Sequence, residues 1–255
     1  MWKKNIAKAF ALILIIALIY LIGYGVYRDK LNSKRATEAI QAQKLTKEDT
    51  EVDTEVINNK TLTYKDKNWM AIGDEITKNN QYQKYVVEAC EFSSVVTTAE
   101  TGITLHIMDD KVTTELLKDI DVVTVFAGVN DFGDNRPLGS IEDSTLVDTF
   151  YSDMKAVIEN LEKIKPEIKI IFITTPYVGK DGYGFVKNDV GNTLEDYTEA
   201  MIEVCGLYDI PVLDLHANSG INENNLLEYS TNSIHPNEAG MKLIGKMIGE
   251  FINKL

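Results

Sequence analysis

Four short polar blocks hold residue types that could act together in chemistry. Glycine and asparagine N–H groups can stabilise negative charge, and a histidine can accept or release a proton near neutral pH. The carboxylate of Glu75 stands at the apex of a strand-turn-helix pattern, where a nucleophile is often presented, yet a carboxylate is a weak nucleophile. The blocks are Gly73-Asp74-Glu75, Gly102, Gly128 to Asp131 with Asn130 inside it, and the segment from Asn232 to His235.

Short apolar runs alternate with longer amphipathic ones from residue 66 onward and must position these blocks. The alternation predicts right-handed crossovers and a parallel sheet, in which sites form at the carboxyl ends of the strands. Strands are expected at 69–73, 92–98, 121–128, 168–176 and 210–215. Helices are expected at 79–90, at 144–166 where Pro166 ends the helix, at 193–208, and at 236–255 where Pro236 begins the helix.

The blocks "GDEIT", "ETGIT", "GVNDFG" and "NSIHPNEAG" occur in this order over residues 66–255. Each block is a weak motif, but four in order on five strands and their helices form a specific pattern. The chain therefore resembles the SGNH hydrolase family, also called GDSL-type esterases. The resemblance implies an α/β fold of three α/β/α layers, with a five-stranded parallel sheet of the flavodoxin-like type.

The resemblance also implies roles for individual residues. In the family a serine attacks an ester, a histidine accepts its proton, and an aspartate orients the histidine. His235 matches the base, and Gly102 and Asn130 match the donors of the oxyanion hole. Residues expected to support the site are Gly73, Asp74, Gly128 and Asp131.

Two positions depart from the family pattern. Glu75 stands at the nucleophile position, where it places a negative charge beside the oxyanion hole. Asn232 stands at the aspartate position, where it can accept a hydrogen bond from His235 or donate one and select the other tautomer. Thr77 and Ser233 are the nearby hydroxyl groups, and we expect both to point away from the site.

These departures leave three hypotheses about function. The first is a degenerate serine esterase that binds a ligand such as a glycan or a partner protein. The second is an active esterase or deacetylase on an O-acylated carbohydrate or a similar ester, with Glu75 near His235 acting as a general base on water. The third is a surface scaffold, in which Tyr177 and Tyr183 could stack on sugars, although such tyrosines more often pack within a loop.

The amino-terminal region has the composition of a membrane anchor. Residues 1–8 form a short basic tail. Residues 9–27 contain no charged residue, and as a helix this run would be nearly long enough to span a bilayer. A cleaved signal peptide is the competing interpretation, but "GYGVYRDK" offers no good cleavage site. We therefore expect a single-pass anchor, a polar stalk at 28–65 and a hydrolase-like domain at 66–255, with this carboxyl-terminal domain outside the cell.

Charge and cysteine content restrict the partners. Residues 66–255 hold 15 of the 26 basic residues and 32 of the 39 acidic ones, so this domain is expected to repel nucleic acid. Cys90 and Cys205 are the only cysteines and are expected to be small buried residues. A disulfide between them is the alternative. We assign His106 and His216 ordinary structural roles, and the sequence implies no metal and no cofactor.

Overall fold

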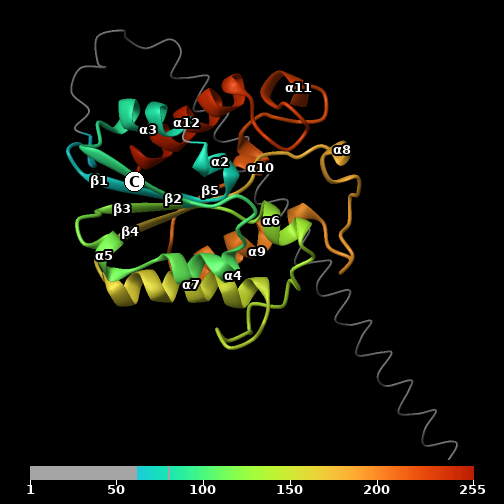
Figure 1. Ribbon diagram of the computed structural model, residues 1–255, viewed down its shortest axis with the longest axis horizontal. Coiled ribbons are helices and arrows are strands. Elements are labelled where there is room, and N and C mark those ends of the chain that lie inside the picture. The colour runs from blue at the N-terminus through green and yellow to red at the C-terminus, as the bar shows by residue number, and fades with distance from the viewer. Residues whose placement is uncertain (1–61, 80) are drawn as a thin grey trace, which may run out of the picture. The chain divides into compact units, whose positions relative to one another are not determined.

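The computed structural model describes residues 62–79 and 81–255 (Figure 1). They belong to the compact unit Thr61–Leu255. The expected anchor at 9–27 lies outside the described residues, as does the stalk apart from its last four residues. Within the described residues, no helix is both long and apolar enough to cross a membrane.

A single parallel sheet of five strands forms the centre of the unit and confirms the predicted fold class. The strand order is β2-β1-β3-β4-β5, so the chain reverses direction across the sheet between β1 and β3. In sheets of this order, ligand sites form at that reversal, at the carboxyl ends of the strands. The strands are β1 (Asn68–Gly73), β2 (Ser94–Ala99), β3 (Val122–Phe126), β4 (Lys169–Ile173) and β5 (Val212–Leu213).

Helices connect the strands and cover both faces of the sheet (Figure 1). In chain order they are α2 (Glu75–Lys78), α3 (Gln83–Cys90), α4 (Leu105–Met108), the 3₁₀ helix η1 (Asp109–Lys111), α5 (Thr114–Leu117), α6 (Val129–Gly133), α7 (Phe150–Ile164), α8 (Lys180–Tyr183), α9 (Leu194–Leu207), α10 (Leu215–Asn218), α11 (Leu226–Tyr229) and α12 (Glu238–Ile252).

Several predicted boundaries differ from the structure, and three of these differences have a clear local cause. Helix α7 begins at Phe150 and not at 144, because the Thr149 side chain caps it by accepting from the Ser152 N–H. Helix α12 begins after the Asn237 cap and not at Pro236. Strand β5 has two residues where six were expected, since Asp214 already caps α10 by accepting from the Ala217 N–H.

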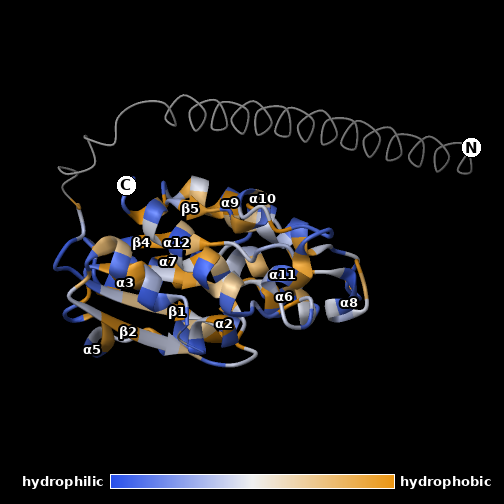
Figure 2. Cartoon of the chain, turned by 90° about the horizontal axis from the view of Figure 1, so that it is seen from above, coloured by the Kyte–Doolittle hydropathy of each residue, from blue (hydrophilic) through white to orange (hydrophobic). Residues whose placement is uncertain are grey.

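The sheet separates two apolar cores, and apolar residues gather where the helices meet the sheet (Figure 2). Residues of α4, α5, α7 and α9 fill one core, and residues of α3, α10 and α12 fill the other. Cys205 belongs to the first core and Cys90 to the second, and both thiols are free. The two cysteines therefore lie on opposite faces of the sheet and do not pair.

The corner between β1 and α2 depends on the absence of a side chain at Gly73. A Cβ there would lie 2.2 Å from Thr77 Oγ1 and 2.6 Å from the Phe126 carbonyl oxygen. Thr77 is buried, and its hydroxyl lies 3.2 Å from the Tyr82 hydroxyl. The glycine thus lets the first turn of α2 fold back against β3 and sets the position of Glu75.

Gly73→Ala is expected to lower the free energy of unfolding by about 1–3 kcal/mol, the usual cost of overpacking a core. The added methyl group would overlap a neighbouring carbonyl group that belongs to the sheet. Chemical denaturation monitored by circular dichroism measures the change.

Gly206→Ala is the matched control. No atom of a neighbouring residue lies within 4 Å of a Cβ at Gly206, and the residue is inside helix α9. This substitution is expected to raise stability by roughly 0.5–1 kcal/mol, because alanine favours the helix over glycine. Equal effects of the two substitutions would contradict a steric role for Gly73.

Candidate active site

Glu75 is the first residue of helix α2 and directly follows the carboxyl end of β1. Asp74 caps this helix, with its Oδ1 accepting a hydrogen bond of 2.9 Å from the Ile76 N–H. The Glu75 side chain is 15% exposed, so the protein surrounds most of it. The local sequence therefore fixes where the Glu75 side chain starts, and neighbouring loops decide what it contacts.

One carboxylate oxygen of Glu75 accepts hydrogen bonds from both predicted oxyanion-hole donors. The Gly102 N–H lies 3.0 Å from Glu75 Oε2, and the Asn130 side-chain amide lies 3.3 Å from the same oxygen. Gly102 lies in the loop after β2, and Asn130 lies in α6 after β3. The Glu75 carboxylate thus occupies the position in which the family resemblance places a substrate oxygen.

The other carboxylate oxygen faces His235. His235 Nε2 lies 3.3 Å from Glu75 Oε1, although 160 residues separate the two in the chain. A tight loop presents the ring: Ser230 and Pro236 form an antiparallel bridge across the loop, and the Thr231 N–H donates to the His235 carbonyl oxygen at 2.9 Å. The His235 side chain is 38% exposed and can be reached from solvent.

Asn232 contacts His235 twice. Its Oδ1 accepts from the His235 backbone N–H at 2.9 Å, and its carboxamide lies against His235 Nδ1, at 2.9 Å for Nδ2 and 3.0 Å for Oδ1. The tertiary structure therefore brings together all five residues to which the sequence assigned catalytic or oxyanion-hole positions: Glu75, Gly102, Asn130, Asn232 and His235. Their roles in chemistry stay predictions.

The two hydroxyl groups near the site point elsewhere, as expected. Thr77 turns into the core beneath α2. Ser233 has a positive φ of 66°, and its side chain lies against Gly179 in the loop after β4. Neither hydroxyl is placed to replace a serine at position 75.

Burial by itself would raise the pKa of Glu75, but hydrogen bonds reverse this effect. The Gly102 N–H, the Glu75 backbone N–H, Asn130 and His235 together hold the pKa of Glu75 below its usual value. Glu75 is therefore ionised at neutral pH. Charge-assisted hydrogen bonds of this kind are stronger than neutral ones, so these donors stabilise the ionised carboxylate.

The shape of the Glu75 side chain explains how it fits. An acylated serine carries its carbonyl carbon two bonds beyond Cβ, and a glutamate carries its carboxylate carbon at the same distance. Glu75 Oε2 then has the place of an acyl carbonyl oxygen beside Gly102 and Asn130, and Oε1 has the place of the acyl substituent and faces His235. The side chain thus resembles an acyl-serine in length and shape.

Two buried aspartates support the loops of the site. Asp131 accepts from the Leu105 N–H at 3.1 and 3.3 Å, which ties α6 to the segment that follows Gly102. Burial raises the pKa of Asp131 to about 7. Burial, together with the adjacent Glu75 charge, raises the pKa of Asp74 to about 8. Of two neighbouring acids, Asp74 is thus protonated at neutral pH while Glu75 is ionised.

Tyr183 supports the site, a role that the sequence indicated only as packing within a loop. Its hydroxyl donates to the Val129 carbonyl oxygen at 3.2 Å, and its ring packs edge-on against Phe132 at 5.4 Å. Tyr183 thereby holds α6, the helix of Asn130, and is engaged in ordinary packing. Its place in the loop after β4 was the only sequence signal. Tyr177 lies beside His216, with 6.4 Å between the ring centroids.

An ion pair that the sequence did not link, together with a histidine, packs beside the site. Arg136 donates to Asp153 at 2.6 Å, and His106 Nδ1 lies 3.1 Å from Asp153 Oδ1. Because α7 carries Asp153, this pair fastens the segment after α6 to the helix layer. No set of three or more His, Cys, Asp or Glu residues in residues 62–79 and 81–255 could hold a metal ion.

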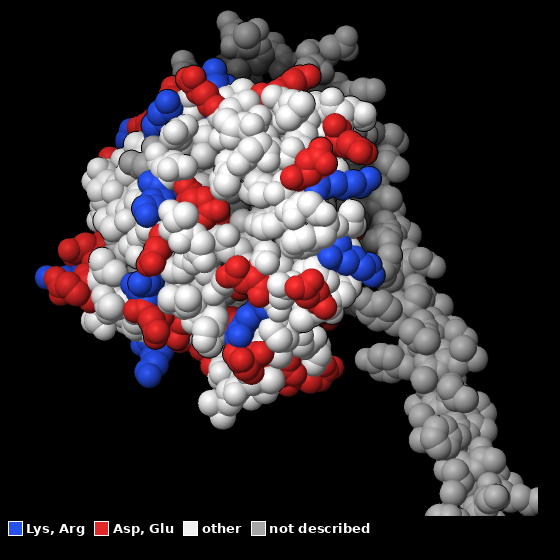
Figure 3. Space-filling view, turned by 45° about the vertical axis from the view of Figure 1, so that its right-hand side comes forward, with Lys and Arg blue, Asp and Glu red and all other residues white. Residues whose placement is uncertain are grey.

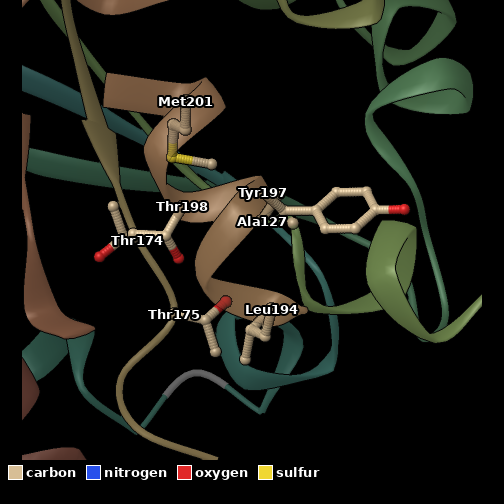
Figure 4. A pocket seen from close by; sticks show the side chains of 8 residues that line it. Ala127, Thr174, Thr175, Leu194, Tyr197, Thr198 and Met201 are labelled. Atoms are coloured by element: carbon tan, nitrogen blue, oxygen red, sulfur yellow. The ribbon is translucent and has the colours of Figure 1, made fainter. Parts of the chain in front are cut away.

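A small cavity lies beneath the loop after β3 (Figure 4). Its volume is about 10 Å³, and its lining includes Gly128, three threonines and Met201. A cavity of this volume has room for one water molecule at most. Among the residues of the site, Asn232 is exposed and the His235 side chain is partly exposed, so solvent reaches both.

The face of the molecule in Figure 3 carries acidic and basic side chains in small groups, with uncharged surface between them. On this face the acidic side chains are dispersed, and the basic side chains do not form a continuous track for a polyanion.

Comparison with known proteins agrees with this arrangement. The model of the GDSL-like Lipase/Acylhydrolase family matches residues 62–243. The chain therefore belongs to this family of SGNH hydrolases.

Solved structures give the same result for the fold. A protein from Lactobacillus plantarum is 25% identical, with a TM-score of 0.67 over 74% of this chain and 98% of the other. A possible lipase from Chitinophaga pinensis is 21% identical, with a TM-score of 0.59 over 74% of this chain and 98% of the lipase. The lipase/acylhydrolase from Enterococcus faecalis is 20% identical, with a TM-score of 0.56 over 74% of this chain and 96% of the other. No curated protein matches the chain.

Stability is expected to fall as the pH rises from about 4 to about 8. An unfolded aspartate releases its proton near pH 3.9. Folded Asp131 and Asp74 keep theirs up to about pH 7 and about pH 8. In this window the folded state binds more protons, so each group lowers the free energy of unfolding by up to about 1.4 kcal/mol per pH unit.

Asp131→Asn is expected to flatten this slope between pH 5 and 7, and the exposed Asp134→Asn serves as its control. Denaturant titrations at several pH values measure the slopes. A slope that is the same in Asp131→Asn and in the unmodified protein would contradict the assignment.

Proposed function

We propose that this protein is a degenerate serine esterase whose site is closed by its own Glu75, and that it acts by binding a ligand and not by serine-type hydrolysis. The ligand classes that we propose are a glycan and a partner protein. The family membership supports the fold and the place of the site, and the substitutions at Glu75 and Asn232 support the loss of turnover.

One observation carries the proposal: Glu75 Oε2 accepts from both Gly102 and Asn130. An ester can be activated in this site only if its carbonyl oxygen binds these same donors. The carboxylate occupies them and adds a negative charge at the point where a transition state would develop one. Closure by Glu75 thus removes both the nucleophile and the oxyanion hole.

The alternative, an active esterase with Glu75 as a general base on water, fits this geometry less well. The carboxylate would have to leave the Gly102 and Asn130 donors before a substrate carbonyl could enter. Its pKa is also held below the usual value, and this weakens it as a base near neutral pH.

The proposal includes attachment to a membrane through residues 9–27, with the hydrolase-like domain outside the cell. Its support is the uncharged run itself, preceded by three lysines and followed by a polar segment. A stalk at 28–65 would then connect the anchor to the domain.

The unmodified protein is expected to show no labelling by a fluorophosphonate and no hydrolysis of acetyl esters. Glu75→Ser with Asn232→Asp restores the family pattern and is expected to create both activities. Glu75→Ser alone should be slower by up to roughly 10⁴ in turnover, the cost of losing a triad aspartate in serine proteases. Probe labelling and ester hydrolysis assays measure these effects.

His235→Ala added to the double variant is the control and should abolish the created activity. Robust turnover by the unmodified protein that is lost in Glu75→Gln would overturn the proposal. A folded double variant that stays inert would argue against an intact substrate pocket.

Deletion of residues 9–27 is expected to move the protein from the membrane fraction to the soluble fraction, because it removes the only uncharged run of that length at the amino terminus. Fractionation and immunoblotting of whole cells measure the distribution. Deletion of residues 36–54 removes the same number of residues from the polar segment and serves as the control. A full-length chain found in the soluble fraction would contradict the anchor.

A further inference from the structure

The Asn232 carboxamide is held in one orientation by the backbone of its own loop. Its Oδ1 accepts the His235 backbone N–H at 2.9 Å and lies 3.4 Å from the Ile234 N–H. Both of these groups can only donate, so the atom that faces them must be the amide oxygen. The NH₂ group is therefore fixed as well, and it lies 2.9 Å from His235 Nδ1.

An NH₂ group can only donate, and so it needs a bare nitrogen as its partner. Asn232 Nδ2 lies 2.9 Å from His235 Nδ1, and Asn232 Oδ1 lies 3.0 Å from the same nitrogen. Because Oδ1 already accepts from the backbone N–H groups of Ile234 and His235, the NH₂ group is the partner left for Nδ1. That contact is satisfied when Nδ1 carries no proton. An aspartate at position 232 would do the opposite, since it would accept a proton from Nδ1.

The opposite side of the ring imposes the matching requirement. Glu75 Oε1 lies 3.3 Å from His235 Nε2, and an ionised carboxylate can only accept hydrogen bonds. The contact is favourable when Nε2 carries the proton. Two separate contacts, one on each ring nitrogen, thus select the same form of the imidazole.

We propose that Asn232 is a positioning residue that holds His235 as the neutral tautomer with its proton on Nε2, and that this tautomer fastens the Glu75 carboxylate in the oxyanion hole. The inference rests on the closed site proposed above and explains how the closure is maintained. In this form Nε2 is a donor, so His235 cannot accept a proton from a nucleophile at position 75.

The substitutions at positions 75 and 232 therefore form a matched pair. A serine at position 75 alone would face a protonated Nε2 and would keep its own proton. An aspartate at position 232 alone would place a proton on Nδ1 and turn either a bare Nε2 or a charged ring toward Glu75. The single reversion at position 75 leaves a protonated Nε2 facing the serine, and the single reversion at position 232 leaves either a bare Nε2 or a charged ring facing Glu75. Only the double reversion places a bare Nε2 of a neutral ring opposite a serine.

Long-range ¹H–¹⁵N correlation spectra of the full chain, labelled at histidine and kept in detergent micelles, test this inference directly. The chain has three histidines, and His235→Gln identifies the signals of His235 by their loss. At pH 7 we expect a protonated Nε2 and a bare Nδ1 for His235. A protonated Nδ1, in the other tautomer or in a charged imidazolium, would overturn the proposal.

Asn232→Asp is expected to protonate Nδ1, and Glu75→Ser with Asn232→Asp is expected to give Nδ1–H with a bare Nε2. Asn224→Asp makes the same change on an exposed loop residue and should leave the His235 signals as they are. Unchanged signals in a folded Asn232→Asp variant would also overturn the proposal. If Asn232→Asp does not fold, the protonation of the two His235 ring nitrogens in the unmodified chain is the test of the proposal.

The two proposals can fail separately. Ester turnover by the unmodified chain with His235 protonated on Nε2 would reject the proposed function and keep the tautomer. An inert chain with His235 protonated on Nδ1 would reject the tautomer and keep the proposed function.

Discussion

The rest of the site depends on the hydrogen bonds from Gly102 and Asn130 to one oxygen of the Glu75 carboxylate. These two contacts join the loops that follow β2 and β3 to the first turn after β1. A partly buried carboxylate is stable only when donors compensate for its lost hydration, and here the Gly102 N–H and the Asn130 amide supply them. The contact with His235 then links the last loop to the same group.

These hydrogen bonds explain how a glutamate fits at the position where the family motif has a serine. A glutamate at the nucleophile position is a poor nucleophile, yet its side chain has the length of an acyl-serine and meets the same donors. The fold therefore keeps the polar geometry of an esterase without an ester. Asp74 and Asp131 show the opposite response to burial: their pKa values rise, because their burial outweighs the hydrogen bonds that they accept from the Ile76 and Leu105 N–H groups.

Much of the fold could be predicted from the sequence, since strands buried on both faces are continuous apolar runs. The predicted strands over 69–73 and 121–128 correspond to β1 and β3, which carry the site. The predictions failed where a single side chain sets a boundary. Thr149 ends the loop before α7, and Asp214 cuts β5 short, because each of them caps a helix through a local hydrogen bond that periodicity does not report.

The sequence by itself determined the order of the blocks, the family resemblance, and the two substitutions at positions 75 and 232. It could also place Thr77 away from the site, because helical rotation is a local property. Only the tertiary structure decided that the Glu75 carboxylate meets Gly102, Asn130 and His235. These contacts span 27, 55 and 160 residues of the chain, and the spacing of residues in one chain cannot specify which distant groups meet.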